Sequence, residues 1–498
     1  MTPSLDPTTD CRALALALSG KHLINGALVD PVGGRTFDVV HPATLEVIGR
    51  AADGDAADVD RAVQAAHAAQ AAWARVPARQ RGKLVMQVAR RLEDHAEELA
   101  RLITLETGKA IATESRVEAG VHADLYTFFG GLGSELKGET IPFHPDMLVF
   151  TLRHPVGVVG AIVAWNVPLM LMALKVAPAL VAGNTVVVKT AEEAPFACLR
   201  VAQIFNEVLP PGVFNVLSGD GPGCGAPLAD HPLVAKVTLT GSVAAGKSVA
   251  LAAARKLVPV TLELGGKSPM IVLEDADLDQ VVQGALQSMR FTRQGQSCTA
   301  ASRMLVHRSL HDTYVARVKA RVDQLRMGDP FDEATHIGSV ISPGQFATVQ
   351  RYLAIGDATP GATGHRCSAL PSDPRLARGL FVQPTIFTGL PIDSPVIREE
   401  IFGPVTAVIP FDTYEEAIAI ANRTDYGLAA TIWTCDVRRA LDAVHRLEAG
   451  FVQVNQNLVV QSALAYGGIK QSGLGKEASL GAMLTHFTHE KTVLMNLR

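Results

Sequence analysis

After residue 150 the sequence alternates between short runs of β-branched residues and longer stretches with helical periodicity. Runs such as "VGVVGAIVAW", "NTVVVKT" and "VPVTLELGG" are apolar at nearly every position, which is typical of strands buried on both faces of a parallel sheet. A second series, including "SPMIVLE", "RMLVHR" and "AATIWT", follows residue 265. The pattern predicts two α/β domains that meet near residues 262–266, where two glycines interrupt the last strand of the first series.

The composition argues against several classes of function. The chain of 498 residues has a formal net charge of −4 and carries no basic stripe, so we do not expect a nucleic-acid partner. Its six cysteines show no C-x-x-C spacing, which argues against a metal site and a disulfide framework and favours a reducing, cytoplasmic location. The apolar stretch 169–183 is too short to span a bilayer, so we expect no membrane partner either.

Cys298 lies in the polar loop "TRQGQSCTA". A cysteine nucleophile reacts as its thiolate, and a free thiol has a pKa of about 8.5. Backbone N–H donors in a polar loop lower this pKa, whereas an apolar core raises it. The loop therefore indicates Cys298 as a candidate nucleophile, with an inert thiol as the alternative. Cys198 and Cys435 lie in apolar patterns and are expected to be core residues.

Two polar residues stand at the ends of predicted strands. Glu263 in "TLELGG" is a candidate general base, because burial at that place would raise the pKa of its carboxyl. Asn166 in "AWNVPL" directly follows a strand, where its side-chain amide would be placed to donate to a developing oxyanion. The structural alternatives are an ion pair between Glu263 and Lys267, and a turn or helix cap at Asn166.

A dinucleotide site is indicated by two strand ends in the first series. "TGSVAAG" places Gly241 and Ser242 at the start of a helix, where backbone N–H groups favour a pyrophosphate, and Gly246 would let the helix approach the sheet. In "VVVKTAEEAP" Lys189 ends a strand, and Glu192 is placed to accept hydrogen bonds from a ribose. The alternative for "TGSVAAG" is an ordinary strand–helix turn, and the alternative for Lys189 is a solvated charge at a strand end.

Glu400 and Phe402 in "REEIFGPV" precede a Gly-Pro turn. A carboxylate next to an aromatic ring suits a ribose and a flat heterocycle, and a structural turn with a core phenylalanine is the alternative. The glycine-rich stretch 219–225 departs from G-x-G-x-x-G at Cys224 and is interpreted as a turn.

The order of these motifs is more specific than any one of them. "AWN", "VVVKTAE", "TGSVAAG", "LELGGKSP", "QGQSC", "EEIFGPV" and "YGGIKQSGLGKE" resemble, in sequence order and spacing, the NAD(P)-dependent aldehyde dehydrogenase superfamily, from about residue 22 to the C-terminus. The resemblance implies that Cys298 attacks an aldehyde, that Asn166 and the Cys298 N–H hold the oxyanion, and that Glu263 activates water. It implies hydrolysis of the thioester and not transfer to coenzyme A, because acylating members generally lack that glutamate.

The resemblance also implies the cofactor, NAD, with NADP as the alternative because Glu192 can be displaced. Lys189 is placed both among the catalytic residues and, with Glu192, at the adenosine ribose; Ser242 is placed at the pyrophosphate and Glu400 with Phe402 at the nicotinamide ribose. The full set of expected cofactor contacts is Trp165, Lys189, Glu192, Gly241, Ser242, Gly246, Leu264, Gln345, Glu400 and Phe402.

The fold implied is aldehyde dehydrogenase-like α/β, with two parallel-sheet α/β domains and an extended oligomerisation arm. Residues 1–134 and 155–262 are expected to form the cofactor-binding domain and 263–484 the catalytic domain. Residues 135–154 and 485–498 are expected to form arms that join subunits into a homodimer or homotetramer.

This sequence departs from the family pattern at a few positions. Ala164, Thr190 and Ala465 replace the usual prolines, but none of these changes removes a functional group. The spacing from Glu263 to Cys298 is one residue longer than the commonest pattern, which bears on the geometry of the loop.

The positions that match the family's substrate tunnel are almost wholly apolar. They are Val167, Leu171, Leu174, Ser297, Thr299, Leu458, Val460 and Tyr466. Such a lining favours a hydrophobic aldehyde, aromatic or medium-chain aliphatic. The alternative is a semialdehyde with its own carboxylate, because Arg290 and Arg293 lie near the nucleophile loop and could pair with it. A non-catalytic, cofactor-binding relative is a further alternative, disfavoured by the presence of Cys298, Glu263 and Asn166.

Overall fold

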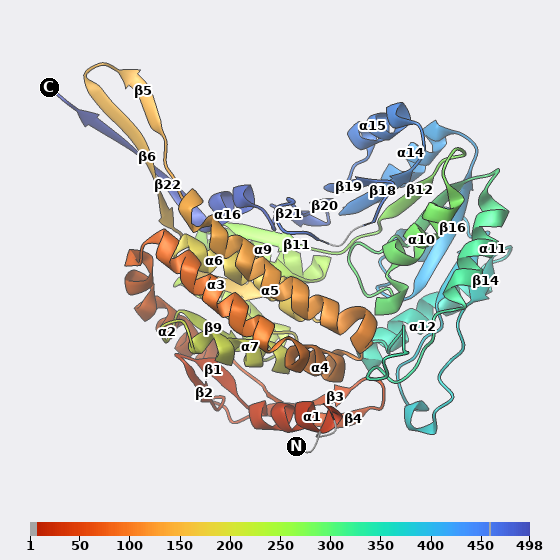
Figure 1. The fold of residues 1–498 in the computed structure, drawn as a ribbon, viewed down its shortest axis with the longest axis horizontal. Coiled ribbons are helices and arrows are strands. Elements are labelled where there is room, and N and C mark those ends of the chain that lie inside the picture. The colour runs from red at the N-terminus through yellow and green to blue at the C-terminus, as the bar shows by residue number, and fades with distance from the viewer. Residues whose placement is uncertain (1–6, 458–459) are drawn as a thin grey trace.

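The computed structural model describes residues 7–457 and 460–498. Figure 1 shows two lobes, each built around a sheet, and a narrow three-stranded sheet that projects from the first lobe. The expected α/β class with two mostly parallel sheets is confirmed. Leu458, one of the expected tunnel residues, lies outside the described residues.

The first sheet has eight strands in the order β2-β1-β9-β8-β7-β10-β11-β21. Its five central strands run parallel, as the apolar runs predict. These are β9 (Phe214–Leu217), β8 (Thr185–Lys189), β7 (Val158–Ile162), β10 (Val234–Thr240) and β11 (Val260–Glu263). The edge strands β2 (Ala27–Val29), β1 (His22–Ile24) and β21 (Gly473–Leu474) are antiparallel to their neighbours.

Helices cover this sheet on both faces (Figure 1). They are α2 (Ala56–Arg75), α3 (Ala78–Asp94), α4 (Ala96–Thr107), α5 (Arg116–Gly131), α6 (Pro168–Ala182), α7 (Phe196–Asn206), α8 (Ala226–Asp230), α9 (Val243–Lys256) and α16 (Leu480–Phe487), with α1 (Pro7–Leu18) and the hairpin β3 (Thr36–His41) and β4 (Glu46–Ala52) below them. The apolar periodicity of residues 79–106 predicts one helix, but the structure has two helices there, separated at His95. The apolar positions on both sides of the break face the same core, so the periodicity did not reveal it.

The second sheet has seven strands in the order β14-β15-β16-β13-β12-β18-β19. All pairs are parallel except the edge pair β14–β15. The strands are β14 (Thr363–Arg366), β15 (Thr385–Thr388), β16 (Val405–Phe411), β13 (Arg303–His307), β12 (Pro269–Val272), β18 (Ala429–Trp433) and β19 (Phe451–Val454). The helices around them are α10 (Leu278–Met289), α11 (His311–Val322), α12 (Pro343–Ala358), α13 (Pro395–Arg398), α14 (Tyr414–Asn422) and α15 (Val437–Arg446).

The chain passes from the first sheet to the second between the end of β11 at Glu263 and the start of β12 at Pro269. It later returns, because β21 pairs with β11 and the short strand β20 (Ile469–Lys470) pairs with β17 (Tyr426–Gly427). The predicted catalytic segment 263–484 therefore also supplies an edge strand to the first sheet. This return brings residues 466–477 beside the strand ends of the first sheet.

The projecting sheet is formed by β5 (Thr140–His144), β6 (Met147–Pro155) and β22 (Thr488–Asn496). β22 runs antiparallel to β6 along its whole length, so the two segments expected to be arms pair with each other. The sheet carries exposed apolar side chains, among them Phe143 and Leu494.

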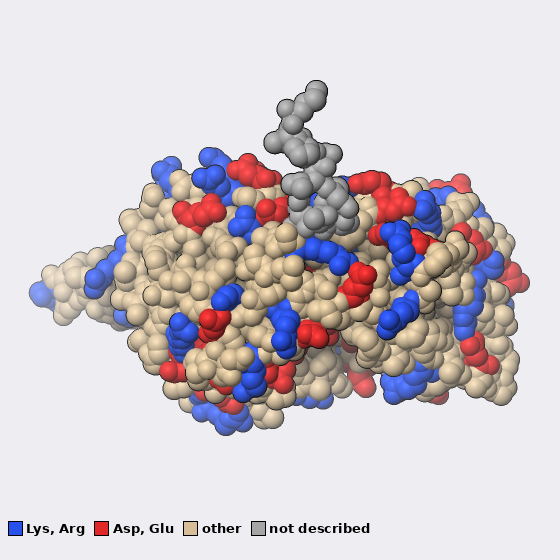
Figure 2. Space-filling model, turned by 90° about the horizontal axis from the view of Figure 1, so that it is seen from below, with Lys and Arg blue, Asp and Glu red and all other residues tan. Residues whose placement is uncertain are grey.

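Charges of both signs are interspersed over the face shown in Figure 2, from which the projecting sheet extends to the left. Within the described part of the chain, no helix is long and apolar enough to cross a membrane.

Candidate active site

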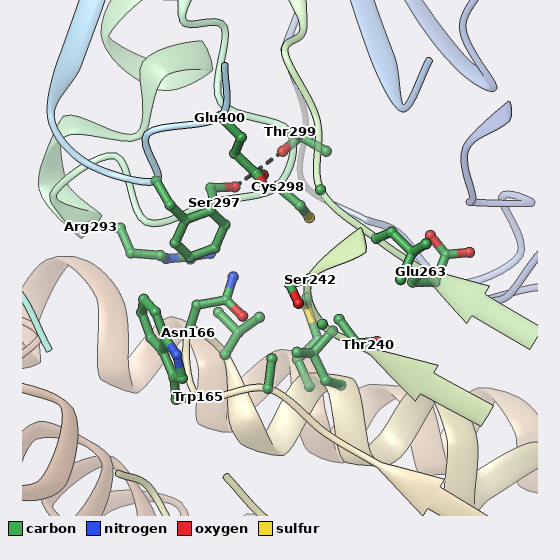
Figure 3. A pocket seen from close by; sticks show the side chains of 18 of the residues that line it. Trp165, Asn166, Thr240, Ser242, Glu263, Arg293, Ser297, Cys298, Thr299 and Glu400 are labelled. Carbon is green, nitrogen blue, oxygen red and sulfur yellow. Dashed lines mark hydrogen bonds between the residues drawn. The ribbon is translucent and has the colours of Figure 1, made fainter. Parts of the chain in front are cut away.

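A cavity of about 330 Å³ lies where the strand ends of the first sheet meet the loop before β13 of the second. Its wall brings together Asn166, Glu263, Cys298 and Glu400, which the sequence placed on four separate segments. In Figure 3 the Cys298 sulfur points into the cavity, Asn166 lies on the opposite wall, and Glu263 lies to one side.

Cys298 lies in the loop that connects the 3₁₀ turn Phe291–Arg293 to β13. Its sulfur is 3.3 Å from the hydroxyl oxygen of Tyr466. Burial raises the pKa of the thiol to about 11, and the Tyr466 hydrogen bond and Arg293 oppose that rise. The expectation that the polar loop lowers this pKa is therefore wrong, because the tertiary structure buries the loop against the first lobe. The thiol is therefore largely protonated at neutral pH, and a nucleophilic role would require removal of its proton.

Tyr466 was expected only to line the substrate tunnel, but it also contacts Cys298. Its side chain is buried, and its hydroxyl contacts the sulfur of Cys298, the candidate nucleophile. The two residues are 168 positions apart, so only the return of the chain to the first sheet brings them together. An O–H donor at this distance stabilises a thiolate more than a thiol.

We expect Tyr466→Phe to raise the pKa of Cys298 by about one to two units, because a hydrogen bond to a charged group contributes about 1.5–3 kcal/mol. The pH dependence of Cys298 alkylation by iodoacetamide measures this shift. Tyr414→Phe is the matched control, since its hydroxyl bonds Asp442 at the surface of the second lobe. An unchanged alkylation profile in Tyr466→Phe would show that the hydroxyl does not support the thiolate.

Asn166 lies between β7 and α6 and is buried. Its side-chain nitrogen donates to the carbonyl oxygen of Gln296 at 3.3 Å, two residues before the nucleophile. The main-chain carbonyl oxygen of Asn166 accepts a hydrogen bond from Lys109 Nζ at 2.9 Å. Lys109 also forms a buried ion pair with Glu118. The Asn166 amide is thus held against the Cys298 loop, and the helix-cap alternative is not observed, because the N-cap residue of α6 is Val167.

Glu263 ends β11 with both carboxylate oxygens buried and without a hydrogen-bond partner among the described residues. The structural alternative, an ion pair with Lys267, is not formed. Burial raises the pKa of Glu263 well above its usual value, and the nearby carboxylate of Glu477 raises it further. Glu477 itself accepts from Lys175 Nζ at 2.7 Å. A buried carboxyl without a partner is costly to maintain and is typical of a reacting group.

The two glycines that follow Glu263 and Leu264 lie at points of close packing. A Cβ at Gly265 would lie 2.0 Å from Glu400 Oε2, and one at Gly266 would lie 2.4 Å from the Cys298 carbonyl oxygen. The Gly266 N–H also donates to Glu400 Oε1 at 2.9 Å. The glycines therefore allow Glu400 and the nucleophile loop to pack closely on the end of β11. Burial raises the pKa of Glu400 to about 7.

Phe402 and Trp165 form an edge-to-face pair in the cavity wall, with ring centroids 5.2 Å apart. Phe402 has a left-handed backbone with φ of +58°. Gln345 donates to the carbonyl oxygens of Ile401 and Phe402 at 2.9 and 3.0 Å. Gln345 therefore fixes the loop that presents Glu400 and Phe402, in addition to lining the cavity.

The remaining expected cofactor contacts follow the strand ends of the first sheet. Ser242 caps α9 by accepting from the Ala245 N–H at 3.2 Å, and a Cβ at Gly246 would lie 2.6 Å from Leu264. Ser242, Gly241 and Leu264 line the cavity. Lys189 is 3.2 Å from Glu192, and neither lines the cavity around Cys298. The geometry therefore places Lys189 with the cofactor candidates and away from the nucleophile.

Most of the expected tunnel residues line this cavity as well. They are Val167, Leu171, Leu174, Ser297, Thr299, Val460 and Tyr466. Sequence reasoning missed Met170, Thr240 and Glu477, although Glu477 closes the motif "YGGIKQSGLGKE". Thr240 ends β10 and begins the motif "TGSVAAG", which could have indicated it. The positions of Met170 and Glu477 depend on the packing of α6 and of the returning chain, which no local sequence pattern indicates.

The profile of the aldehyde dehydrogenase family matches residues 28–493. The chain belongs to this family. It is an aldehyde dehydrogenase with an α/β fold of the family type. The family match covers nearly the whole chain. It agrees with the order of the sequence motifs whose residues line the cavity.

Solved structures similar to this aldehyde dehydrogenase cover nearly the whole chain. A putative aldehyde dehydrogenase from Burkholderia cenocepacia is 39% identical, covers 96% of this chain and 98% of its own, and has a TM-score of 0.93. The NAD⁺ complex of the Bacillus cereus aldehyde dehydrogenase is 37% identical, with 99% of each chain covered and a TM-score of 0.94. Betaine aldehyde dehydrogenase from Staphylococcus aureus, also with NAD⁺, is 34% identical, with 99% of this chain and 98% of its own covered and a TM-score of 0.94.

Two of the other cysteines in this aldehyde dehydrogenase were expected to be buried and inert. Cys198 is buried in the core of the first lobe, and its pKa is raised well above the usual value by burial. Cys435 is exposed, so the expectation of a core position is wrong for it. It follows the end of β18, where the apolar pattern belongs to the strand and does not extend to the turn.

Proposed function

We propose that this enzyme oxidises an aldehyde to its carboxylic acid with NAD⁺, through a thioester on Cys298. The balanced reaction consumes the aldehyde, NAD⁺ and water and yields the carboxylate, NADH and two protons. The observation that carries the proposal is the convergence of Cys298, Asn166 and an unpartnered Glu263 on one cavity. A nucleophile, an oxyanion donor and a base are the groups that acyl-enzyme chemistry requires.

The residues at the strand ends fit a dinucleotide. The start of α9 offers backbone N–H groups near Ser242, and the buried hydroxyl of Thr240 lines the cavity without a partner among the described residues. Glu192 is partly exposed beside Lys189, where a carboxylate suits a ribose diol and repels a 2′-phosphate, which supports NAD over NADP. Glu400, Phe402 and Trp165 would hold the nicotinamide end. NAD⁺, when bound, supplies the hydride acceptor.

Cys298 would attack the aldehyde carbon as a thiolate and form a thiohemiacetal. The Asn166 amide, which points to the nucleophile loop, and the Cys298 N–H would hold the oxygen that becomes negative. One such donor contributes roughly 2.7–4 kcal/mol in comparable sites. Loss of a hydride from the thiohemiacetal carbon leaves a thioester on Cys298.

Glu263 would then remove a proton from the water that hydrolyses the thioester. Its burial makes it a stronger base once ionised than an exposed glutamate. Because its pKa is raised, a growing fraction ionises as the pH increases. Hydrolysis is therefore expected to accelerate with pH until Glu263 is fully ionised.

The cavity wall supports a substrate with an apolar body. Met170, Leu171, Leu174 and Val460 supply apolar surface on the side of the nucleophile occupied by α6 and the returning chain. We therefore propose an aromatic or medium-chain aliphatic body for the aldehyde. A second candidate, a carboxylate-bearing aldehyde, is favoured by one cation in the same wall and is developed below.

We propose that the first lobe binds the cofactor, that the second supplies the nucleophile, and that the projecting sheet joins subunits into a homodimer or homotetramer. Exposed apolar side chains on the projecting sheet support an interface, since isolated patches of this kind usually mark association. Light scattering in solution distinguishes the dimer from the tetramer.

We expect the purified protein to form NADH with benzaldehyde and with hexanal, and to prefer NAD⁺ to NADP⁺ by about tenfold or more in kcat/KM. Absorbance of the reduced cofactor measures both preferences. Glu192→Ser is expected to narrow the cofactor preference by removing the repulsion of a 2′-phosphate. Absence of reduced cofactor with every aldehyde tested would refute the proposed activity.

A further inference from the structure

One arginine in the wall of the catalytic cavity has no charged partner. Arg290 directly follows α10 and has a left-handed backbone, with φ of +54°, which side-chain-bearing residues rarely adopt. Both Arg290 and Arg293 line the cavity that contains Cys298. The two arginines lie on the same short segment, but their surroundings differ.

Arg293 is already neutralised. Its Nε donates to Glu114 Oε2 at 2.6 Å, and Thr292 donates to the other oxygen of the same carboxylate. This ion pair is buried and joins the nucleophile loop to the π-helical turn Ile111–Ser115. Arg293 therefore stabilises the loop, and because Glu114 neutralises its charge we do not expect it to bind an anionic ligand.

Arg290 has no carboxylate within 4.0 Å among the described residues. Among the residues that the structure describes, its one polar contact is long, from a terminal nitrogen to Asn457 Oδ1 at 3.4 Å. A guanidinium has five N–H donors in a planar fork, and one amide oxygen satisfies at most one or two of them. The side chain is partly buried in a wall that is otherwise mostly apolar, where an unpaired cation is unfavourable unless an anion joins it.

We propose that Arg290 binds a carboxylate at the far end of the substrate, so that the enzyme acts on aldehyde acids, with an apolar segment between the two groups. This inference rests on the proposed aldehyde oxidation and names the substrate class of the same cavity. The apolar wall contacts the body of the substrate, and the fork of Arg290 accommodates its anionic end. Oxidation of such a substrate yields a dicarboxylic acid.

Arg290 also lies close enough to Cys298 to act on it electrostatically, which is the competing explanation for a cation in this wall. A cation that served only the thiolate would affect every aldehyde equally. A cation that binds the substrate's carboxylate affects only the aldehydes that carry one. Matched pairs of substrates therefore separate the two roles.

The test compares 4-carboxybenzaldehyde with 4-methylbenzaldehyde, and succinic semialdehyde with butanal, for the wild type and Arg290→Met. We expect the wild type to prefer the carboxylate member of at least one pair by about tenfold or more in kcat/KM. Arg290→Met is expected to lower kcat/KM for that member by about 10- to 100-fold, mainly through KM, because one charge-assisted pair is lost. The neutral member should change by less than about threefold.

Two controls make the result specific. Arg290→Lys retains the charge but not the fork, and it should recover part of the loss. Arg90→Met removes an exposed cation from α3 and should change neither member of a pair. High salt should raise KM for the carboxylate substrate in the wild type and have little effect on it in Arg290→Met.

The failures of the two proposals are distinguishable. If the wild type oxidises none of the four aldehydes, the proposed function is wrong. If it oxidises them but Arg290→Met lowers both members of each pair equally, or leaves the preference unchanged, the function stands and the assignment of Arg290 is wrong. Arg290→Gln, with thermal unfolding measured beside activity, gives the same comparison if the methionine variant does not fold.

Discussion

We expect Cys298→Ala to abolish aldehyde oxidation and to retain NAD⁺ binding. Without the sulfur, neither the thiohemiacetal nor the thioester forms, and no other cysteine in the described residues lines the cavity. We expect kcat to fall by at least about four orders of magnitude, as in other enzymes that lose their nucleophile. NADH absorbance measures turnover, and isothermal calorimetry measures cofactor affinity, which should change by less than about threefold.

Cys435→Ala is the matched control, because it removes an exposed thiol outside the cavity. It should retain full activity, and Cys298 should remain the thiol whose alkylation stops turnover. Substantial NAD-dependent oxidation by Cys298→Ala would rule out covalent catalysis at this residue.

Glu263→Gln is expected to separate the two halves of the reaction. The amide cannot accept a proton from water, so the thioester accumulates after the first hydride has left. Stopped-flow absorbance should show a burst approaching one NADH per active site, followed by a steady rate about 10²- to 10³-fold below that of the wild type. Because Glu263 is buried beside Glu477, its pKa is raised, and the steady rate of the wild type should increase with pH.

That increase with pH should be lost in Glu263→Gln, since the group whose ionisation produces it is gone. Glu93→Gln, an exposed change on α3, is the control and should retain both burst and steady rate. If Glu263→Gln turns over at the wild-type steady rate, another group activates the water. If the burst disappears as well, Glu263 acts before the hydride leaves.

Local features of the sequence predicted much of the fold. The apolar runs identified the central strands because residues buried on both faces of a parallel sheet have no polar side. Asp55 caps α2, and Gly108 ends α4 with φ of +70°, which are the residue types that commonly begin and end helices. The break at His95 was not predicted, because the helices on either side of it bury the same face. The pairing of the two arms in one sheet was also not predicted, since strand pairing joins segments far apart in sequence.

The features of the candidate site can also be separated into those that the sequence determined and those that only the tertiary structure decided. By itself the sequence determined the two α/β series, the position of each reacting residue at a strand end or in a loop, and, through the order of the motifs, the resemblance to the family. These depend on periodicity and residue type, which are local. The tertiary structure alone decided that Cys298 is buried with a raised pKa and that Tyr466 contacts it. It also decided that Arg293 forms an ion pair, while Arg290 forms none with the described residues. Desolvation and charge pairing depend on which distant segments pack together, and no stretch of sequence contains that information.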